Sequence, residues 1–496
     1  MLPEFLFLVL LFMAGGLTIY SLGLSGWGVG PVGFLVGIYL WIVFGVLYVV
    51  LGFSTNPKNI LIPLVVLVLI NTVHLIRKGN GMRELIGPLS VYVTIIWLVV
   101  WLTNNYGLVK YHIDSFRYLL SAGLLSEDNF TFANENLLVK RGLATPLLHM
   151  PSSLYGGFYV ASITPMLSIS TVGAMAWLLT HGFHANEKKG LLWSAVALVV
   201  MLAITNNRYV WNSFYINGHL FVGSALLMLT GSIWLMDRRN DCRSYYAYLL
   251  SALSVAVLIV ARPEGFIIAM LGIIPILALP EKSEPLFRLL LLVFGLFCAS
   301  WNAYIIVELL GSGKSVTSFL AIAVVLGSGG IMASIFPIYD RLRQNSVLLL
   351  RLFELSLWAF LCVASFYQPE LTRESLSATF KNLIGGSGSW GSSFILMVLL
   401  TFSSIWMARS KNILMLRFPL TAMVPIFLLL AHLRESAYRV GNGDSLNRMV
   451  FELFPLAVFL IGVLLSDILA EHNATRNISK NKGDSDETNH TNSLLQ

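Results

Sequence analysis

The sequence predicts an all-α polytopic membrane protein with about 15 transmembrane helices, and its composition and the length of its apolar runs support this class. The 496 residues are 56% hydrophobic and only 11% charged, whereas soluble domains carry about 25% charged residues. The apolar residues fall into runs of about 20, the length that an α-helix needs to cross a bilayer. Because a helix satisfies its own backbone hydrogen bonds in lipid, these runs predict helical spans.

The predicted spans follow one another with mostly short loops between them. They cover residues 4–24, 29–52, 58–76, 86–105, 158–180, 190–206, 217–236, 245–261, 265–280, 286–307, 316–338, 346–367, 391–408, 412–431 and 450–469.

Basic residues cluster after the odd-numbered spans of this series. The clusters are Arg77, Lys78 and Arg83; Lys188 and Lys189; Arg238, Arg239 and Arg243; Lys282 and Arg288; Arg341 and Arg343; and Arg409 and Lys411. Loops rich in Lys and Arg stay in the cytoplasm, so this parity predicts an external N-terminus and a cytoplasmic C-terminus in a multi-pass protein of the cell membrane.

The same reading divides the chain into segments with different roles. Residues 1–105 form N-terminal transmembrane helices, and 106–157 form a large external loop with an amphipathic helix and a candidate catalytic acid. Residues 158–470 form the transmembrane core. The polar segment 471–496 has few aromatic residues and is expected to be a disordered cytoplasmic tail.

Charge and cysteine content exclude some classes of function. The net charge of +7 comes mainly from loop clusters, so it predicts membrane orientation and no nucleic-acid partner. The three cysteines lack CxxC spacing, so we expect neither a disulfide framework nor a zinc site.

The external loop opens with the polar stretch YHIDSFRYLLSAGLLSEDNF. Phe116, Leu120 and Leu124 recur at helical spacing, which predicts an amphipathic helix along the membrane interface with Asp114 near its start. Asp114 either caps this helix or accepts a proton from an attacking group or holds a metal ion. Further along the loop, His149 is either a hydrogen-bonded structural residue or a group that titrates near neutral pH in a pocket.

Arginines recur on the predicted external side. Arg262 and Glu264 lie in the turn RPEG between two spans, where they either pair with each other or present a guanidinium to an anionic phosphate. Arg448, at the start of the last span, either extends to the interface or binds phosphate. With Arg208 they form an external face of arginines, which favours phosphate recognition.

The order of these motifs resembles the GT-C superfamily of polytopic glycosyltransferases, in the branch of protein O-mannosyltransferases and the aminoarabinose transferase of lipid A. The similar segments are Asp114 to Tyr118 followed by LLSAGLL, the stretch TPLL that begins at Thr145, the turn RPEG, and the late NRMVFELFP segment. The chain departs from the pattern at Ser115, where a second acid is usual, and at Met449, where tyrosine is usual.

The resemblance implies an inverting transfer of a sugar from a polyprenyl-phosphate donor to a glycan, lipid or protein acceptor at the outer face of the bilayer. Asp114 would be the catalytic base, while Arg208, Arg262 and Arg448 would stabilise the phosphate leaving group. Arg117, Tyr118, His149 and Glu264 complete the expected substrate-binding set. With a single acid in the motif, we expect no obligatory cofactor, although some members of the superfamily use a divalent metal.

Other polytopic classes remain as alternatives. A transporter or lipid flippase predicts charges within the spans and related halves, whereas the main charge within a span here is Glu354. A polysaccharide polymerase or ligase usually has a very large late external loop, whereas the largest loop here is 106–157. A non-catalytic scaffold is the remaining alternative.

Overall fold

The computed structural model describes residues 1–78, 81–107, 113–128, 142–183, 218–240, 244–336, 338–387, 390, 392–407, 411–433, 435–441 and 446–467. Within these ranges the regular structure is helical, without strands. The elements that the text uses are α1 (Leu2–Ser21), α2 (Val29–Val50), α3 (Pro57–Arg77), α4 (Gly81–Tyr106), α5 (Ile113–Ser126), α7 (Ala144–His149), η3 (Met150–Tyr155), α8 (Ile163–Gly182), α11 (His219–Arg238), α12 (Tyr245–Ala261), α13 (Gly265–Ile273), η4 (Ile274–Ala278), α14 (Glu284–Gly311), α15 (Ser318–Ile335), α16 (Ile338–Arg343), α17 (Ser346–Tyr367), α18 (Pro369–Leu383), α19 (Ser392–Met407) and α20 (Lys411–Leu433). A further helix, Leu446–Asp467, is called the last helix below.

Eleven helices in the described part of the chain are long and apolar enough to cross a membrane. This confirms a polytopic helical protein, but not the predicted count of spans. Three predicted spans coincide with the shorter helices α12, α13 with η4, and α19, and the predicted span 190–206 lies outside the described residues. The predicted span 265–280 changes from α-helix to 3-10 helix at Ile274, where Pro275 removes a backbone donor.

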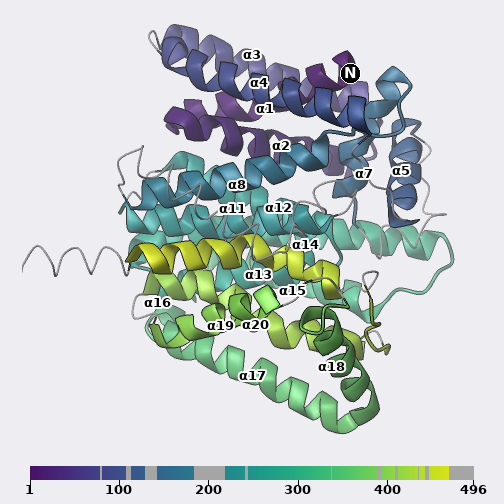
Figure 1. Ribbon diagram of the computed structural model, residues 1–496, viewed down its shortest axis with the longest axis vertical. Coiled ribbons are helices and arrows are strands. Elements are labelled where there is room, and N and C mark those ends of the chain that lie inside the picture. The colour runs from purple at the N-terminus through teal and green to yellow at the C-terminus, as the bar shows by residue number, and fades with distance from the viewer. Residues whose placement is uncertain are drawn as a thin grey trace, which may run out of the picture.

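The axes of most helices are roughly aligned with one another, and the helices pack side by side (Figure 1). α1 packs on α2 and α3, and α2 in turn contacts α8 and α12. α11 packs between α8 and α12. α14 packs against α15, and α17 packs against α20. α11 and α17 mark the extremes, because the most apolar stretch of α11 is completely buried, whereas only 11% of the residues in that of α17 are buried.

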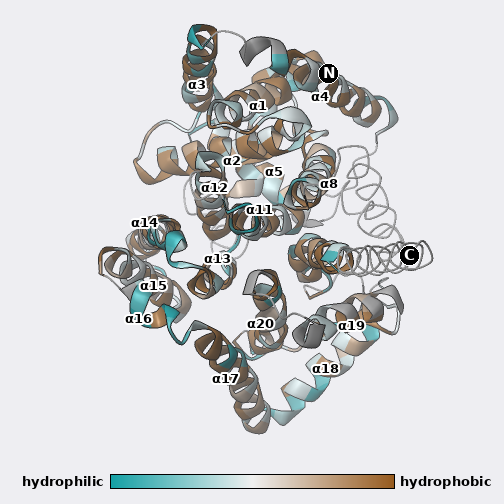
Figure 2. Cartoon of the chain, turned by 90° about the vertical axis from the view of Figure 1, so that its left-hand side faces the viewer, coloured by the Kyte–Doolittle hydropathy of each residue, from teal (hydrophilic) through white to brown (hydrophobic). Residues whose placement is uncertain are grey.

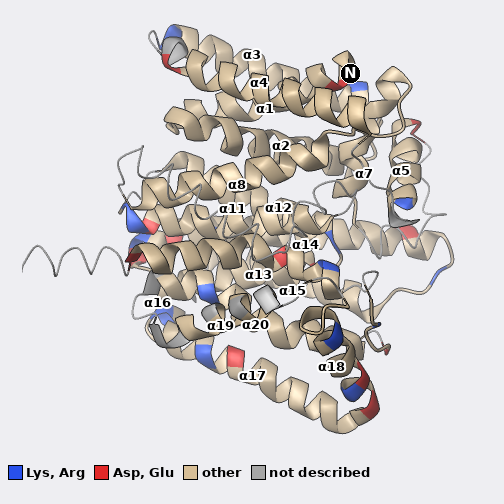
Figure 3. Ribbon diagram, in the orientation of Figure 1, with Lys and Arg blue, Asp and Glu red and all other residues tan. Residues whose placement is uncertain are grey.

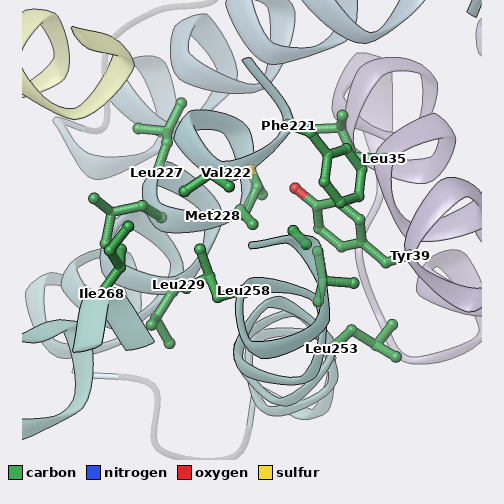
Figure 4. Packing of buried hydrophobic residues seen from close by; sticks show 14 of the residues in the cluster. Leu35, Tyr39, Phe221, Val222, Leu227, Met228, Leu229, Leu253, Leu258 and Ile268 are labelled. Carbon is green, nitrogen blue, oxygen red and sulfur yellow. The ribbon is translucent and has the colours of Figure 1, made fainter. Parts of the chain in front are cut away.

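The core is formed where α2, α11, α12 and α13 meet (Figure 4). Tyr39 of α2 packs edge-on against Phe221 of α11, with ring centroids 5.8 Å apart. Its hydroxyl forms a 3.0 Å hydrogen bond with Oγ of Ser224. Because a buried polar atom without a partner is costly, this bond lets the tyrosine fill the core.

The basic clusters that the structure describes gather at one end of the bundle. In Figure 3 the ends of α3 and α11 and the short helix α16, which carry such clusters, lie on the left, while α5, α7 and α18 lie on the right. Figure 2 shows hydrophobic residues along the outer helix α17, which suits a surface facing lipid. The common end of the clusters agrees with the parity of the sequence, and the assignment of that end to the cytoplasm remains a prediction.

At the opposite end of the bundle, two carboxylates form hydrogen bonds that connect different helices. Glu4 is buried, and its Oε1 accepts hydrogen bonds of 2.7 Å from both the backbone N and the Oγ of Ser162, just before α8. Asp128, which follows α5, accepts bonds of 2.6 Å from the Ser54 hydroxyl and the Thr55 backbone N, before α3. Burial raises the pKa of Asp128, but the hydrogen bonds outweigh it and hold the pKa below its usual value.

Candidate functional site

The helix α5 carries the predicted catalytic acid, and it turns its polar side inward. Ser115 and Tyr118 are buried, whereas Phe116 is 62% exposed and Arg117 is also exposed. A helix therefore lies where the sequence predicted one, and Phe116 of its apolar face points away from the protein. Its position at a membrane interface stays a prediction. Asp114 is the second residue of α5, and its side chain lies outside the described part of the structure.

The RPEG turn forms the centre of the candidate site. Arg262 has an extended backbone and ends α12, because a residue before proline avoids the helical conformation. Glu264 then begins α13. A Cβ at Gly265 would lie 1.7 Å from the carbonyl oxygen of Leu258, so glycine lets α13 start directly against α12.

Arg262 and Glu264 form a buried ion pair. Nε and Nη2 of Arg262 donate to the same oxygen, Oε1 of Glu264, over 3.2 Å and 2.7 Å. Among the described residues, Nη1 of Arg262 has no hydrogen-bond partner. Burial lowers the pKa of Arg262, but Glu264, Tyr118 and Glu452 outweigh it and raise the pKa above its usual value. The arginine is therefore charged, and its Nε and Nη2 are already used in hydrogen bonds to Glu264.

A second acid, which the sequence analysis missed, joins this pair from the last helix. Glu452 is completely buried, and its Oε1 lies 3.9 Å from Nε of Arg262. The same oxygen lies 2.7 Å from Nδ1 of His219, the first residue of α11. Arg262, Glu264, Glu452 and His219, called the end cluster below, have zero net charge when His219 is in its imidazolium form. A carboxyl and a histidine within apolar spans were the available signal, because such residues usually face a polar interior.

Within the predicted loop 106–157, the backbone at Gly142 and Leu143 packs against the end of α12, next to Arg262. A Cβ at Gly142 would lie 2.1 Å from the carbonyl oxygen of Ala261, and the N–H of Leu143 donates to the carbonyl oxygen of Val260 over 3.0 Å. The chain thus satisfies a carbonyl at the C-terminus of α12, where intrahelical donors have run out. The loop that begins with α5 therefore returns to the residue before Arg262.

Aromatic packing covers the last helix beside Glu452. Trp390 is buried, and its ring lies 4.8 Å from that of Phe451, the neighbour of Glu452. Phe454 contributes a second contact at 6.0 Å. Trp390 therefore packs in the core.

The other predicted site residues have different surroundings. His149 is buried in α7, and burial lowers its pKa to about 3. Its Nδ1 accepts a 3.2 Å hydrogen bond from the backbone N of Val160, which agrees with the structural alternative for this histidine. Arg448 is half-buried on the last helix, four residues before Glu452. Arg208 lies outside the described residues.

A separate charged site lies between α17 and α20. Nη1 and Nη2 of Arg417 donate to Oε1 and Oε2 of Glu354 over 2.9 Å and 3.0 Å. Thr421 donates to Oε1 of Glu354 and accepts from Nη1 of Arg417. Glu354 was recognisable in the sequence as a charge within a span, but its partner Arg417 lies 63 positions further along the chain.

The described side chains can supply charge, hydrogen bonds and a proton, but within these residues no group of three His, Cys, Asp or Glu is placed to hold a metal ion. Comparison with protein-family models, with curated proteins and with solved structures finds no match for this chain.

Proposed function

We propose that this protein is a membrane glycosyltransferase that moves a sugar from a polyprenyl-phosphate donor to an acceptor at the outer face of the membrane. The observation that carries the proposal is the end cluster, a set of buried ionisable groups at the N-terminal end of α11, whose C-terminal end carries a basic cluster. Buried charges of this kind usually serve a polar substrate or an ion pathway. A position at one end of the helices favours chemistry at the membrane surface.

In this mechanism Asp114, at the start of α5, accepts the proton of the acceptor hydroxyl or amine while that group attacks the anomeric carbon. The bond between the anomeric carbon and the phosphate oxygen breaks, the phosphate keeps the electron pair, and the configuration of the sugar inverts. Tyr118 of α5 is buried and lies within electrostatic range of Arg262.

The leaving phosphate needs a cation, and Arg262 is the described residue best suited to supply it. Glu264 occupies Nε and Nη2, which holds the guanidinium in a fixed orientation. Nη1 remains for a ligand oxygen, and a fixed donor aimed at developing charge stabilises a transition state without reorganisation. Arg448 on the last helix, and Arg208 in the segment before α11, are the further arginines proposed for this role.

The test is transfer or slow hydrolysis of labelled polyprenyl-phosphate sugars by the purified protein in detergent. We expect turnover by the wild type and none by Asp114→Asn, with equal yields of folded protein. Glu127→Gln is the matched control, because Glu127 is an exposed acid directly after α5, and it should retain activity. Full activity of Asp114→Asn would remove the central claim.

The transporter alternative has its own outcome. If neither wild type nor variants turn over any donor, the protein is reconstituted into vesicles and movement of labelled lipid or solute across the bilayer is measured. Movement that depends on the end cluster would replace transfer by transport as the function.

A further inference from the structure

The helix α18 follows the membrane-spanning helix α17 after a single residue, Gln368. In Figure 2, which looks along most helices of the bundle, α18 is seen from its side, so it lies across their direction. Figure 1 places it at the same end of the bundle as α5. A helix that begins where a span ends and then runs across it lies at the level of the membrane interface.

Three faces of α18 have different characters. The face toward the protein contains Ser375, Ala378 and Asn382, all buried. The second face is apolar although it is exposed, with Leu376 47%, Phe380 60% and Ile384, just past the helix end, 37% exposed. These positions are four residues apart, so they form one continuous row along the helix.

The third face is polar and lies beside the apolar row. It includes Glu370, Glu374, Ser377 and Lys381, all exposed, whereas Arg373 lies seven residues before Phe380 and so precedes the apolar row on the same side of the helix. Arg373 and Glu370 form an exposed ion pair with a distance of 2.6 Å. A helix with an apolar face and an adjacent face of charged residues has the pattern of interfacial helices, which bury the apolar face between acyl chains and keep the charges among the headgroups.

The apolar row of α18 continues a surface that already faces lipid. Phe366 and Tyr367, the last residues of α17, are 88% and 84% exposed. Aromatic residues at the end of a span are typical of the membrane–water boundary. The apolar face of α18 therefore begins where the lipid-facing surface of α17 ends.

Hydrogen bonds hold α18 in this position at both ends. His432 of α20 bonds through Nε2 to the hydroxyl of Thr372 over 3.1 Å and through Nδ1 to Oε1 of Gln368 over 3.2 Å. At the other end, Nδ2 of Asn382 donates to the carbonyl oxygen of Arg439 and Oδ1 accepts from the N–H of Gly441, both over 2.7 Å. The apolar row thus has a fixed orientation relative to α20.

We propose that α18 is a membrane-binding surface, with Leu376, Phe380 and Ile384 inserted between phospholipid acyl chains and with Arg373 and Lys381 next to phosphate headgroups. The bilayer is the occupant that fits, because the row continues the exposed surface of α17 and has cations beside it. This inference does not depend on the proposed enzymatic activity.

The test is site-directed spin labelling of the full chain in vesicles of equal parts phosphatidylcholine and phosphatidylglycerol. Nitroxides are attached to Leu376→Cys, Phe380→Cys and the neighbouring Ser377→Cys after Cys242 and Cys362 are changed to alanine; Cys298 is buried. We expect the ratio of oxygen to nickel-chelate accessibility to be several-fold higher at 376 and 380 than at 377. Val363→Cys on exposed α17 gives the value for lipid contact.

Two results would overturn the proposal. Equal ratios at 376, 377 and 380 would mean that the row lies in water. Spectra at 376 and 380 that sharpen on dilution with unlabelled protein would mean that a second copy of the chain covers the row. The labelled positions are exposed, so the labels should not disturb folding. An unchanged elution volume on size-exclusion chromatography checks this.

Discussion

The end cluster and the Arg417–Glu354 pair both bury an arginine with a carboxylate, but their geometries differ. In the α17–α20 pair, two guanidinium nitrogens meet two carboxylate oxygens over 2.9 Å and 3.0 Å, and Thr421 completes the group. In the end cluster, two nitrogens of Arg262 share one oxygen of Glu264. The first is a closed pair between two neighbouring helices. In the second, Nη1 of Arg262 has no hydrogen-bond partner among the described residues, and the cluster joins segments that are far apart in the sequence.

This difference separates two reasons for placing charge in a membrane protein. A closed pair fastens one helix to another, and it can be replaced by apolar side chains of similar volume without loss. An open cluster keeps charged groups near a position where a substrate can reach them, and apolar replacement then removes the function. The same kind of substitution at both sites therefore tests the distinction.

The largest expected effect is that of Arg262→Met. The change leaves Glu264 buried without its cation, and loss of one partner of a buried pair costs about 3–5 kcal/mol. We expect a large fall in the melting temperature of the detergent-solubilised protein and no sugar transfer. Thermal unfolding by scanning fluorimetry and the transfer assay measure both.

Two companion variants separate folding from function at this site. The double variant Arg262→Met with Glu264→Leu removes the ion pair, so most of the lost stability should return while transfer stays absent. Arg262→Lys keeps the charge but loses the planar fork, so the yield of folded protein should hold while activity falls. A double variant with normal transfer would show that the end cluster is only structural.

A smaller effect is expected for Arg417→Met. Its partner Glu354 lies on the exposed helix α17, with 15% of its side chain accessible, and an unpaired acid within a span costs about 2.5–3.5 kcal/mol. We expect a lower melting temperature, whereas transfer per folded molecule stays at the wild-type rate. A loss of transfer at equal folded yield would contradict the assignment of this pair as a closed structural contact.

The double variant Glu354→Leu with Arg417→Met is the matched control for the end cluster. It removes both charges from the α17–α20 contact, so its stability should lie within about 1 kcal/mol of the wild type. The two double variants should thus agree in stability and differ in activity. If they agree in activity as well, the comparison between open and closed sites fails.

The elements of the fold were largely predictable because run length and hydrophobicity determine where a membrane helix lies. The predicted spans at 346–367 and 412–431 coincide closely with α17 and α20. In contrast, α18 was predicted as a loop. Its sequence is rich in charged and polar residues, and its apolar row has only three members, so hydrophobicity alone does not indicate a helix there.

Partners across the end cluster were harder to predict than its centre. Arg262 and Glu264 are two residues apart, so their pairing was one of the alternatives read from the sequence. His219 and Glu452 are 233 residues apart, and nothing local in the sequence connects them. Only the packing of α11 beside the last helix brings them together.

The smallest expected effect is the contribution of His149 to the pH dependence of protein stability. Burial lowers its pKa to about 3 in the folded protein, whereas an unfolded histidine has a pKa of about 6.5. As the pH falls below about 6.5, the unfolded state binds a proton that the folded state does not. Stability should therefore be fully present above this pH and decline below it, by up to about 1.4 kcal/mol per pH unit.

His149→Asn isolates this contribution, because the asparagine Oδ1 can still accept the hydrogen bond from the backbone N of Val160. Melting temperatures of the wild type and the variant are compared between pH 7 and pH 5. We expect the variant to lose less stability over this range, and an equal loss would show that His149 does not carry the dependence.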